Sequence, residues 1–233
     1  MLRIIQKLTK STLFKSTGTY TVANIIRAFI PLLLLPILTK YLSPADFGRV
    51  AIFQVTIALT LPLINLNTHG AITRRFFDKN IHFASYLSNC LFIAVLTTLL
   101  FSLLFLLSIS ILKSFLPLSL TLISSIPLIC LFQFLSNLPL YVWQVEIKPF
   151  KYSIFSISQS IINVSATLLF VVFLGHGWEG RVNAVILTYI IFSFIGLIIL
   201  VDKNLILFRI NGDYIKRLPG FICQTTLSPI ILE

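Results

Sequence analysis

Arg27 is a cation within a long apolar run, and it is the residue whose chemistry stands out most. Placing Arg at the centre of a membrane helix costs about 2.5–3.5 kcal/mol on insertion scales. A guanidinium offers a planar fork of N–H donors that suits a phosphate group. Arg27 is therefore predicted to be a fixed cation that binds an anion in a cavity. In the alternative interpretation, its side chain snorkels toward the inner headgroups.

Polar side chains recur at helical spacing inside four of the apolar segments. In the first segment, Tyr20, Asn24, Arg27 and Pro31 stand at i, i+4, i+7 and i+11. Since lipid-facing positions should be apolar, such stripes indicate a bundle interior or a water-filled cavity. The residues predicted to bind substrate beside Arg27 are Asn24, Asn65, Gln133, Asn137, Gln159 and Asn163. The alternative is hydrogen bonding between packed helices, at about 0.6 kcal/mol per bond.

Motifs for other chemistry are absent from the sequence. It has no Gly-rich phosphate loop, and His69, His82 and His176 lack metal-ligand spacing. No Ser or Cys lies in a recognisable nucleophile elbow. We therefore expect no catalytic residue, no metal and no cofactor.

The composition indicates which secondary-structure elements carry these polar side chains. Hydrophobic residues make up 57% of the 233 residues and charged residues 11%, against roughly 25% charged residues in soluble domains. This excludes a soluble enzyme, a disordered chain and a conventional nucleic-acid binder. A bilayer core needs about 20 apolar residues per helix. The sequence predicts an all-α integral membrane protein with six spans, near 19–38, 50–69, 85–108, 121–142, 153–174 and 183–201.

Positive charges are distributed unequally around these spans. With six spans, 13 Lys and Arg residues fall on one side and 4 on the other, while Arg27 lies within a span. Cytoplasmic loops carry the excess of Lys and Arg, so both termini are predicted to be cytoplasmic. Residues 1–16 carry four cations among loosely spaced apolar residues. They are interpreted either as a basic amphipathic helix on the inner leaflet or as a solvated arm that only sets topology.

Four loop segments carry a resemblance to a known family. The segment LTKYLSPADFG at 38–48 looks like the signature of polysaccharide flippases, the Wzx-like exporters of O-antigen and capsule repeat units. Three further segments resemble loops of the same family in the same order: GAITRRFFDKN at 70–80, VWQVEIKPFKYSI at 142–154 and GHGWEGRVNA at 175–184. Together they extend the resemblance over residues 15–200.

The resemblance implies membership of the multidrug/oligosaccharidyl-lipid/polysaccharide exporter superfamily, in which two lobes of six spans flank a central cavity. The implied function is translocation of undecaprenyl-pyrophosphate-linked oligosaccharides from the inner to the outer leaflet for lipopolysaccharide and other surface polysaccharides. The implied location is the bacterial inner membrane, and the implied partners are membrane lipids and the polysaccharide polymerase machinery. Basic cavity residues would engage the pyrophosphate. Arg27 fits that role, with Arg49, Arg74 and Arg75 as weaker candidates.

The chain departs from that family pattern after its sixth span. We expect one six-span lobe at 17–202, after the arm at 1–16. Residues 203–233 would then be a cytoplasmic tail, truncated or frameshifted near 216–220. Such a lobe would function by pairing with a second lobe or a second copy of the chain. The alternatives are a multidrug antiporter of the same superfamily, and a membrane fragment or structural subunit without transport activity.

Overall fold

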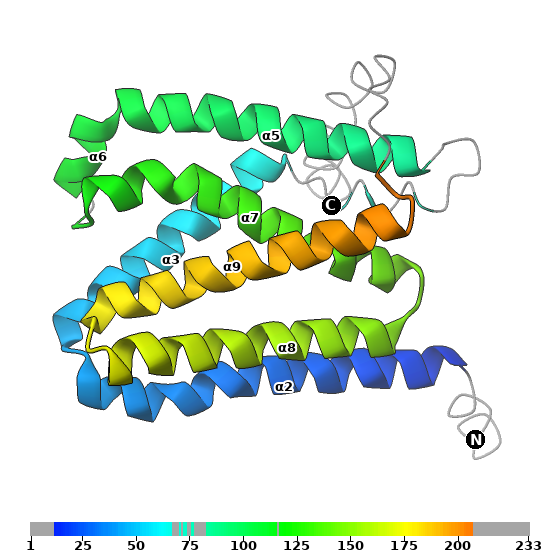
Figure 1. Ribbon diagram of the computed structural model, residues 1–233, viewed down its shortest axis with the longest axis horizontal. Coiled ribbons are helices and arrows are strands. Elements are labelled where there is room, and N and C mark those ends of the chain that lie inside the picture. Colours follow the sequence, from blue (N-terminus) through cyan, green and yellow to red (C-terminus); the bar gives the residue numbers. More distant parts are fainter. Residues whose placement is uncertain are drawn as a thin grey trace, which may run out of the picture. The chain divides into compact units, whose positions relative to one another are not determined.

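Helices form all the regular structure in the part of the chain that the computed structural model describes, which is residues 12–66, 70, 72–73, 76, 83–115 and 117–206 (Figure 1). Six of these helices are long and apolar enough to cross a membrane. They span Thr17–Tyr41, Pro44–Asn65, Phe83–Leu107, Leu120–Val145, Pro149–Phe173 and Gly177–Asp202. The predicted all-α membrane bundle with six spans is thus confirmed. Residues 1–11 of the predicted arm at 1–16 and residues 207–233 of the predicted tail at 203–233 lie outside the described residues.

The second spanning helix, α3 (Pro44–Asn65), begins six residues before its predicted start. The Ser43 Oγ accepts a hydrogen bond from the Asp46 N–H at 3.2 Å, and the Asp46 carboxylate accepts one from the Ser43 N–H at 3.2 Å. This reciprocal cap satisfies two backbone donors of the first turn, and Pro44 favours the first helical position. Hydropathy missed this turn because it is polar.

The chain divides into two compact units, and the first contains residues 1–46 and 139–188. Its described elements are α2 (Thr12–Tyr41), the end of α7 (Leu120–Val145), α8 (Pro149–Thr167), η1 (Leu168–Phe173) and the start of α9 (Gly177–Asp202). α2 packs along α8 (Figure 1). The rings of Tyr20 and Tyr152 join them edge to face, with centroids 5.0 Å apart.

The second unit contains residues 47–138 and 189–233. Its described helices are most of α3, then α5 (Phe83–Leu107), α6 (Ile109–Phe115) and the remaining parts of α7 and α9. The Thr97 hydroxyl of α5 donates to the Ile64 carbonyl of α3 at 2.7 Å. The buried face of α3 has three- and four-residue spacing, with Val50, Phe53, Ile57, Thr60 and Ile64.

Large apolar side chains cover much of the exposed surface of both units. On α2, Val22, Ile25 and Phe29 are each more than half exposed. On α5, Leu99 and Leu103 are similarly exposed. Such surfaces are rare on soluble monomers and are the ones that hydrocarbon solvates. The exposed leucines and isoleucines therefore agree with the six spans assigned from helix length and hydropathy.

The turn between η1 and α9 depends on glycines. Gly175 and Gly177 have φ values of +66° and +55°, in the left-handed region that glycine adopts at little cost. Gly180 lies against η1, since a Cβ placed there would be 2.9 Å from the Phe170 carbonyl oxygen. The segment at 175–184 therefore contains a turn that depends on glycines, and this turn brings η1 and α9 into close backbone contact.

Gly180→Ala is expected to destabilise the protein by about 1–3 kcal/mol, because the added methyl group overpacks against backbone that has little room to move. The measurement is thermal unfolding of the purified protein in detergent. Gly48→Ala is the matched control, since nothing lies within 4 Å of a Cβ at that helical glycine. The control should be neutral or slightly stabilising. Equal unfolding temperatures for the two variants would contradict the close contact at Gly180.

Candidate substrate-binding site

Arg27 lies about halfway along its membrane span. It stands ten residues after Thr17 and fourteen before Tyr41, or about 15 and 21 Å along the helix at ~1.5 Å per residue. Its side chain is half-buried, on the face of α2 that also buries Ala23 and Leu34. The first unit therefore holds a half-buried cation near the middle of a helix that is long and apolar enough to cross a membrane.

Tyr141, near the end of α7, lies close enough to Arg27 for the two side chains to interact electrostatically. Among the described residues Arg27 has no hydrogen bond and no ion pair. A guanidinium has five N–H donors. Arg27 can therefore offer several of them to an anion without first breaking an ion pair of the described structure.

Asn24 lies one helical turn from Arg27, at the edge of the α2–α8 contact. Its side-chain oxygen accepts a hydrogen bond from the Tyr152 hydroxyl at 3.1 Å. The Tyr20 hydroxyl donates to the Trp143 carbonyl at 3.2 Å. These contacts join an amide and a phenol of α2, the helix that carries the cation, to α7 and α8. The sequence pattern identified Tyr20 and Asn24 but did not reveal their partners on α7 and α8.

Asn163 takes part in a hydrogen-bond network between α8 and α9. Its side-chain oxygen accepts from Arg181 at 2.7 Å, and its amide nitrogen donates to the Thr188 hydroxyl at 3.4 Å. Arg181 was assigned from sequence to an outer loop, but it lies in α9 and is half-buried. The helical spacing of Asn163 and Thr167, both bonded to Arg181, was the pattern that could have identified it.

The remaining candidates are distributed over both units. Gln159 is buried on α8 in the first unit, one turn before Asn163. In the second unit, Asn65 at the end of α3 and Asn137 on α7 are half-buried. Gln133 on α7 is also half-buried, and its side-chain oxygen has no hydrogen-bond partner among the described residues.

The weaker basic candidates do not strengthen the site. Arg49 is exposed near the start of α3, while Arg74 and Arg75 lie outside the described residues. Arg27, Asn24, Gln159 and Asn163 therefore all belong to the first unit. The role of each in binding stays a prediction.

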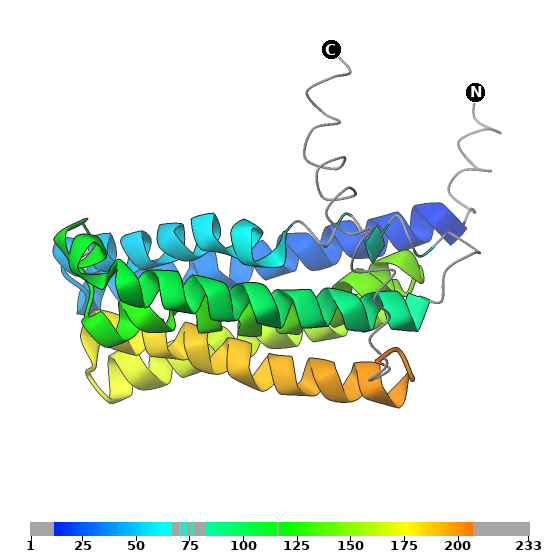
Figure 2. The same ribbon diagram turned by 90° about the horizontal axis from the view of Figure 1, so that it is seen from above.

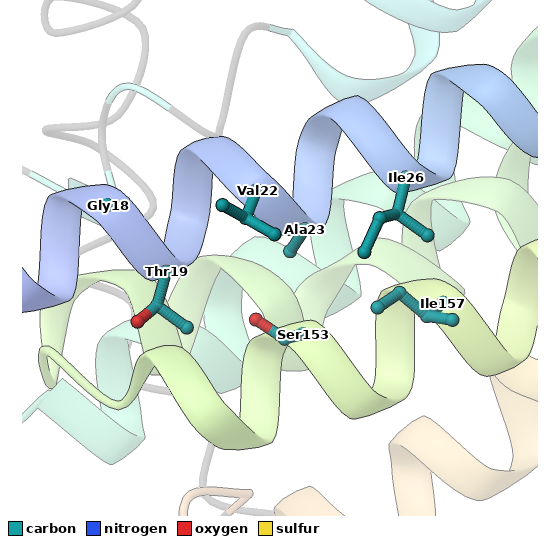
Figure 3. A pocket seen from close by; sticks show the side chains of 7 residues that line it. All are labelled: Gly18, Thr19, Val22, Ala23, Ile26, Ser153 and Ile157. Carbon is teal, nitrogen blue, oxygen red and sulfur yellow. The ribbon is translucent and has the colours of Figure 1, made fainter.

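An apolar groove of about 530 Å³ lies between α2 and α8 (Figure 3). In Figure 3 the α2 side chains of Thr19, Ala23 and Ile26 are directed toward α8, which contributes Ser153 and Ile157. Gly18 and Val22 complete the lining. The volume falls within the range of roughly 300–1,000 Å³ typical of ligand sites. Hydrocarbon fits this lining better than a sugar does, because few polar groups face it.

The fold defines a multi-pass membrane protein with a half-buried cation at mid-span, and Figure 2 shows the same spans turned by 90°. The chain belongs to the polysaccharide biosynthesis protein family, whose model matches residues 13–227. That range includes most of the predicted tail, whose native or frameshifted character stays a prediction.

One relative is protein 1 of the Lsg locus of Haemophilus influenzae, which is 33% identical over 64 residues. The aligned stretch covers 28% of this chain and 16% of that protein, well under two thirds of the relative's length. No solved structure gives a significant match. The family and the six spans therefore support a membrane protein of polysaccharide biosynthesis.

A double-mutant cycle with Asn24→Ala and Tyr152→Phe is expected to give a coupling free energy of about 0.5–1 kcal/mol, because each single change removes the same interhelical hydrogen bond. The measurement is chemical unfolding of the four proteins in detergent. Tyr20→Phe with Asn24→Ala is the control pair, since the Tyr20 hydroxyl bonds Trp143 instead. Additive effects for the Asn24–Tyr152 pair would show that the bond does not join the helices.

Proposed function

We propose that this chain is a flippase lobe that translocates undecaprenyl-pyrophosphate-linked oligosaccharide repeat units from the inner to the outer leaflet for surface polysaccharide biosynthesis. The observation that carries the proposal is Arg27, a half-buried cation at mid-span with no ion pair among the described residues. A pyrophosphate has several negative oxygens, and a guanidinium binds two of them at once. A membrane-embedded phosphate of this kind is what a lipid-linked sugar carries.

The aromatic and amide groups beside Arg27 suit the sugar part of such a substrate. Tyr20, Tyr152 and Asn24 combine flat apolar rings with hydroxyl and amide groups within hydrogen-bond reach of one another. Sugars present apolar faces and many hydroxyl groups, so they bind to mixed surfaces of this type. The Asn24–Tyr152 bond holds both side chains in place before substrate arrives.

The groove between α2 and α8 suits the hydrocarbon part of the substrate. Val22 and Ile26, which line it, are among the exposed apolar side chains of α2. The groove is therefore open to the surrounding hydrocarbon. We propose that it holds part of the polyprenyl chain while Arg27 binds the pyrophosphate.

The six spans would line the translocation path together with a second lobe, on the same polypeptide or on another chain. Polar groups of α7 such as Gln133 and Asn137 are only half-buried in this lobe alone. In hydrocarbon such groups need a protected surface, which a facing lobe supplies. The proposed location is the bacterial inner membrane, as the family resemblance implies. The charge asymmetry of the loops favours an orientation with both termini in the cytoplasm.

A multidrug antiporter of the same superfamily is the less favoured function. Among the described residues, the carboxylates of the spanning helices stand at helix ends, namely Asp46, Glu179 and Asp202. An antiporter driven by protons or sodium ions needs an ionisable group that takes up the ion within the path. The cation at mid-span favours an anionic substrate.

Arg27→Ala is expected to abolish repeat-unit export, because it removes the donors for the pyrophosphate, while membrane insertion stays intact. Export is measured as surface polysaccharide in a strain that lacks its own flippase. Lys113→Ala, which removes an exposed cation on α6, is the matched control and should export normally. Normal export by the Arg27→Ala variant would contradict the proposed role.

Arg27→Lys separates charge from geometry. A lysine keeps the charge but lacks the planar fork, so export is expected to fall well below wild type if two phosphate oxygens are bound together. Full export by this variant would show that charge alone is required at position 27.

A further inference from the structure

In the hairpin formed by α8, η1 and α9, a charge-assisted side-chain contact lies beside a π-helical stretch of backbone. The Arg181 Nη1 of α9 donates to the Asn163 Oδ1 at 2.7 Å and to the Thr167 Oγ1 at 2.6 Å. Both acceptors belong to α8, one turn apart, and Thr167 is its last residue before η1. Figure 1 shows α8 and α9 meeting at this end of the hairpin.

These contacts are partly buried, and further hydrogen bonds hold the side chains around them. Thr167 and Thr188 are almost wholly buried. The Thr167 hydroxyl also donates to the Asn163 carbonyl at 2.7 Å, and the Thr188 hydroxyl donates to the Ala184 carbonyl at 2.7 Å. Charge-assisted bonds are stronger than neutral ones, and a network in low dielectric gains further strength when each member is satisfied.

The backbone that follows is a π-helix, Leu168–Phe173. The π-helix is a rare element that occurs mostly as single-turn bulges, often at functional sites. Its last bonds include Leu174 N–H to the Leu169 carbonyl and His176 N–H to the Phe170 carbonyl, each at 3.0 Å. The Phe170 carbonyl is also the atom that Gly180 approaches. A change of hydrogen-bond register in η1 would therefore move it relative to α9.

We propose that Arg181, Asn163 and Thr167 form a releasable clamp that holds η1 in its π-helical register, and that η1 is the hinge at which this hairpin bends when the clamp opens. The clamp fixes α8 immediately before η1, and the Gly180 contact fixes η1 against α9. When the clamp opens, the contact between Gly180 and the Phe170 carbonyl remains. The hydrogen-bond register of η1 can then change about that contact. The proposal rests on contacts within the first unit and does not require the proposed function.

The test is hydrogen–deuterium exchange by mass spectrometry on the full-length protein in lipid nanodiscs. Arg181→Ala is expected to speed exchange of the amides at 168–176 at least tenfold, with peptides from 17–41 unchanged. Unchanged exchange at 168–176 would overturn the clamp. Equal acceleration in all six spans would also overturn it, because the residue would then only stabilise the fold.

Thr167 gives a second test that leaves Arg181 in place. Thr167→Val removes one acceptor at nearly constant shape and should speed exchange at 168–176, whereas Thr167→Ser keeps the hydroxyl and should restore wild-type exchange. Ser165→Val is the matched control, since Ser165 is exposed on the same turn, and it should leave exchange unchanged. Wild-type exchange in Thr167→Val, or equal effects of the Val and Ser variants at 167, would refute the clamp.

Discussion

An arginine in the middle of a membrane helix is stable only where protein or substrate replaces the water that hydrocarbon excludes. Arg27 occupies such a position on α2, and protein groups lie near its side chain. It lies on the buried face of the helix, near the Tyr141 phenol. Tyr20 and Asn24, which join α2 to α8 through Tyr152, lie seven and three residues before Arg27 on the same helix. A cation held in this way is suited to an anion that itself belongs to a lipid.

Arg181 meets the same physical requirement in a different way. Its guanidinium bonds two side-chain oxygens of α8 within the first unit, so protein groups replace water there. For Arg27 the described residues supply an electrostatic neighbour but no hydrogen bond. This contrast is the reason for assigning ligand binding to Arg27 and a structural or conformational role to Arg181.

Hydropathy was sufficient to predict the six spans, because a bilayer requires about 20 apolar residues per helix and this chain has six such runs. It placed helix ends less well where the first turn is polar, as at Pro44 to Asp46. The same reason put Arg181 in a loop, since the first turns of α9 carry Glu179 and Arg181. Helical spacing showed that polar residues share a stripe. It did not show which of them bond each other, as Asn163 does with Arg181.

The pairing of stripes depends on how neighbouring helices are rotated, which one sequence does not give. Asn24 shows the effect most clearly. Its spacing from Arg27 predicted a common face, whereas the structure places Asn24 at the exposed edge of α2, bonded to Tyr152. The loop motifs predicted the family correctly because they depend on local residue order and not on helix rotation.

The most direct measurement of the central claim is the affinity of the purified full-length protein, in lipid nanodiscs, for undecaprenyl pyrophosphate, compared with Arg27→Gln. Glutamine keeps hydrogen-bonding ability and removes the charge, so the comparison isolates the cation. We predict at least tenfold weaker binding by the variant, with unchanged binding by Lys113→Ala. Equal affinity of the wild type and Arg27→Gln would contradict the assignment of the pyrophosphate to Arg27.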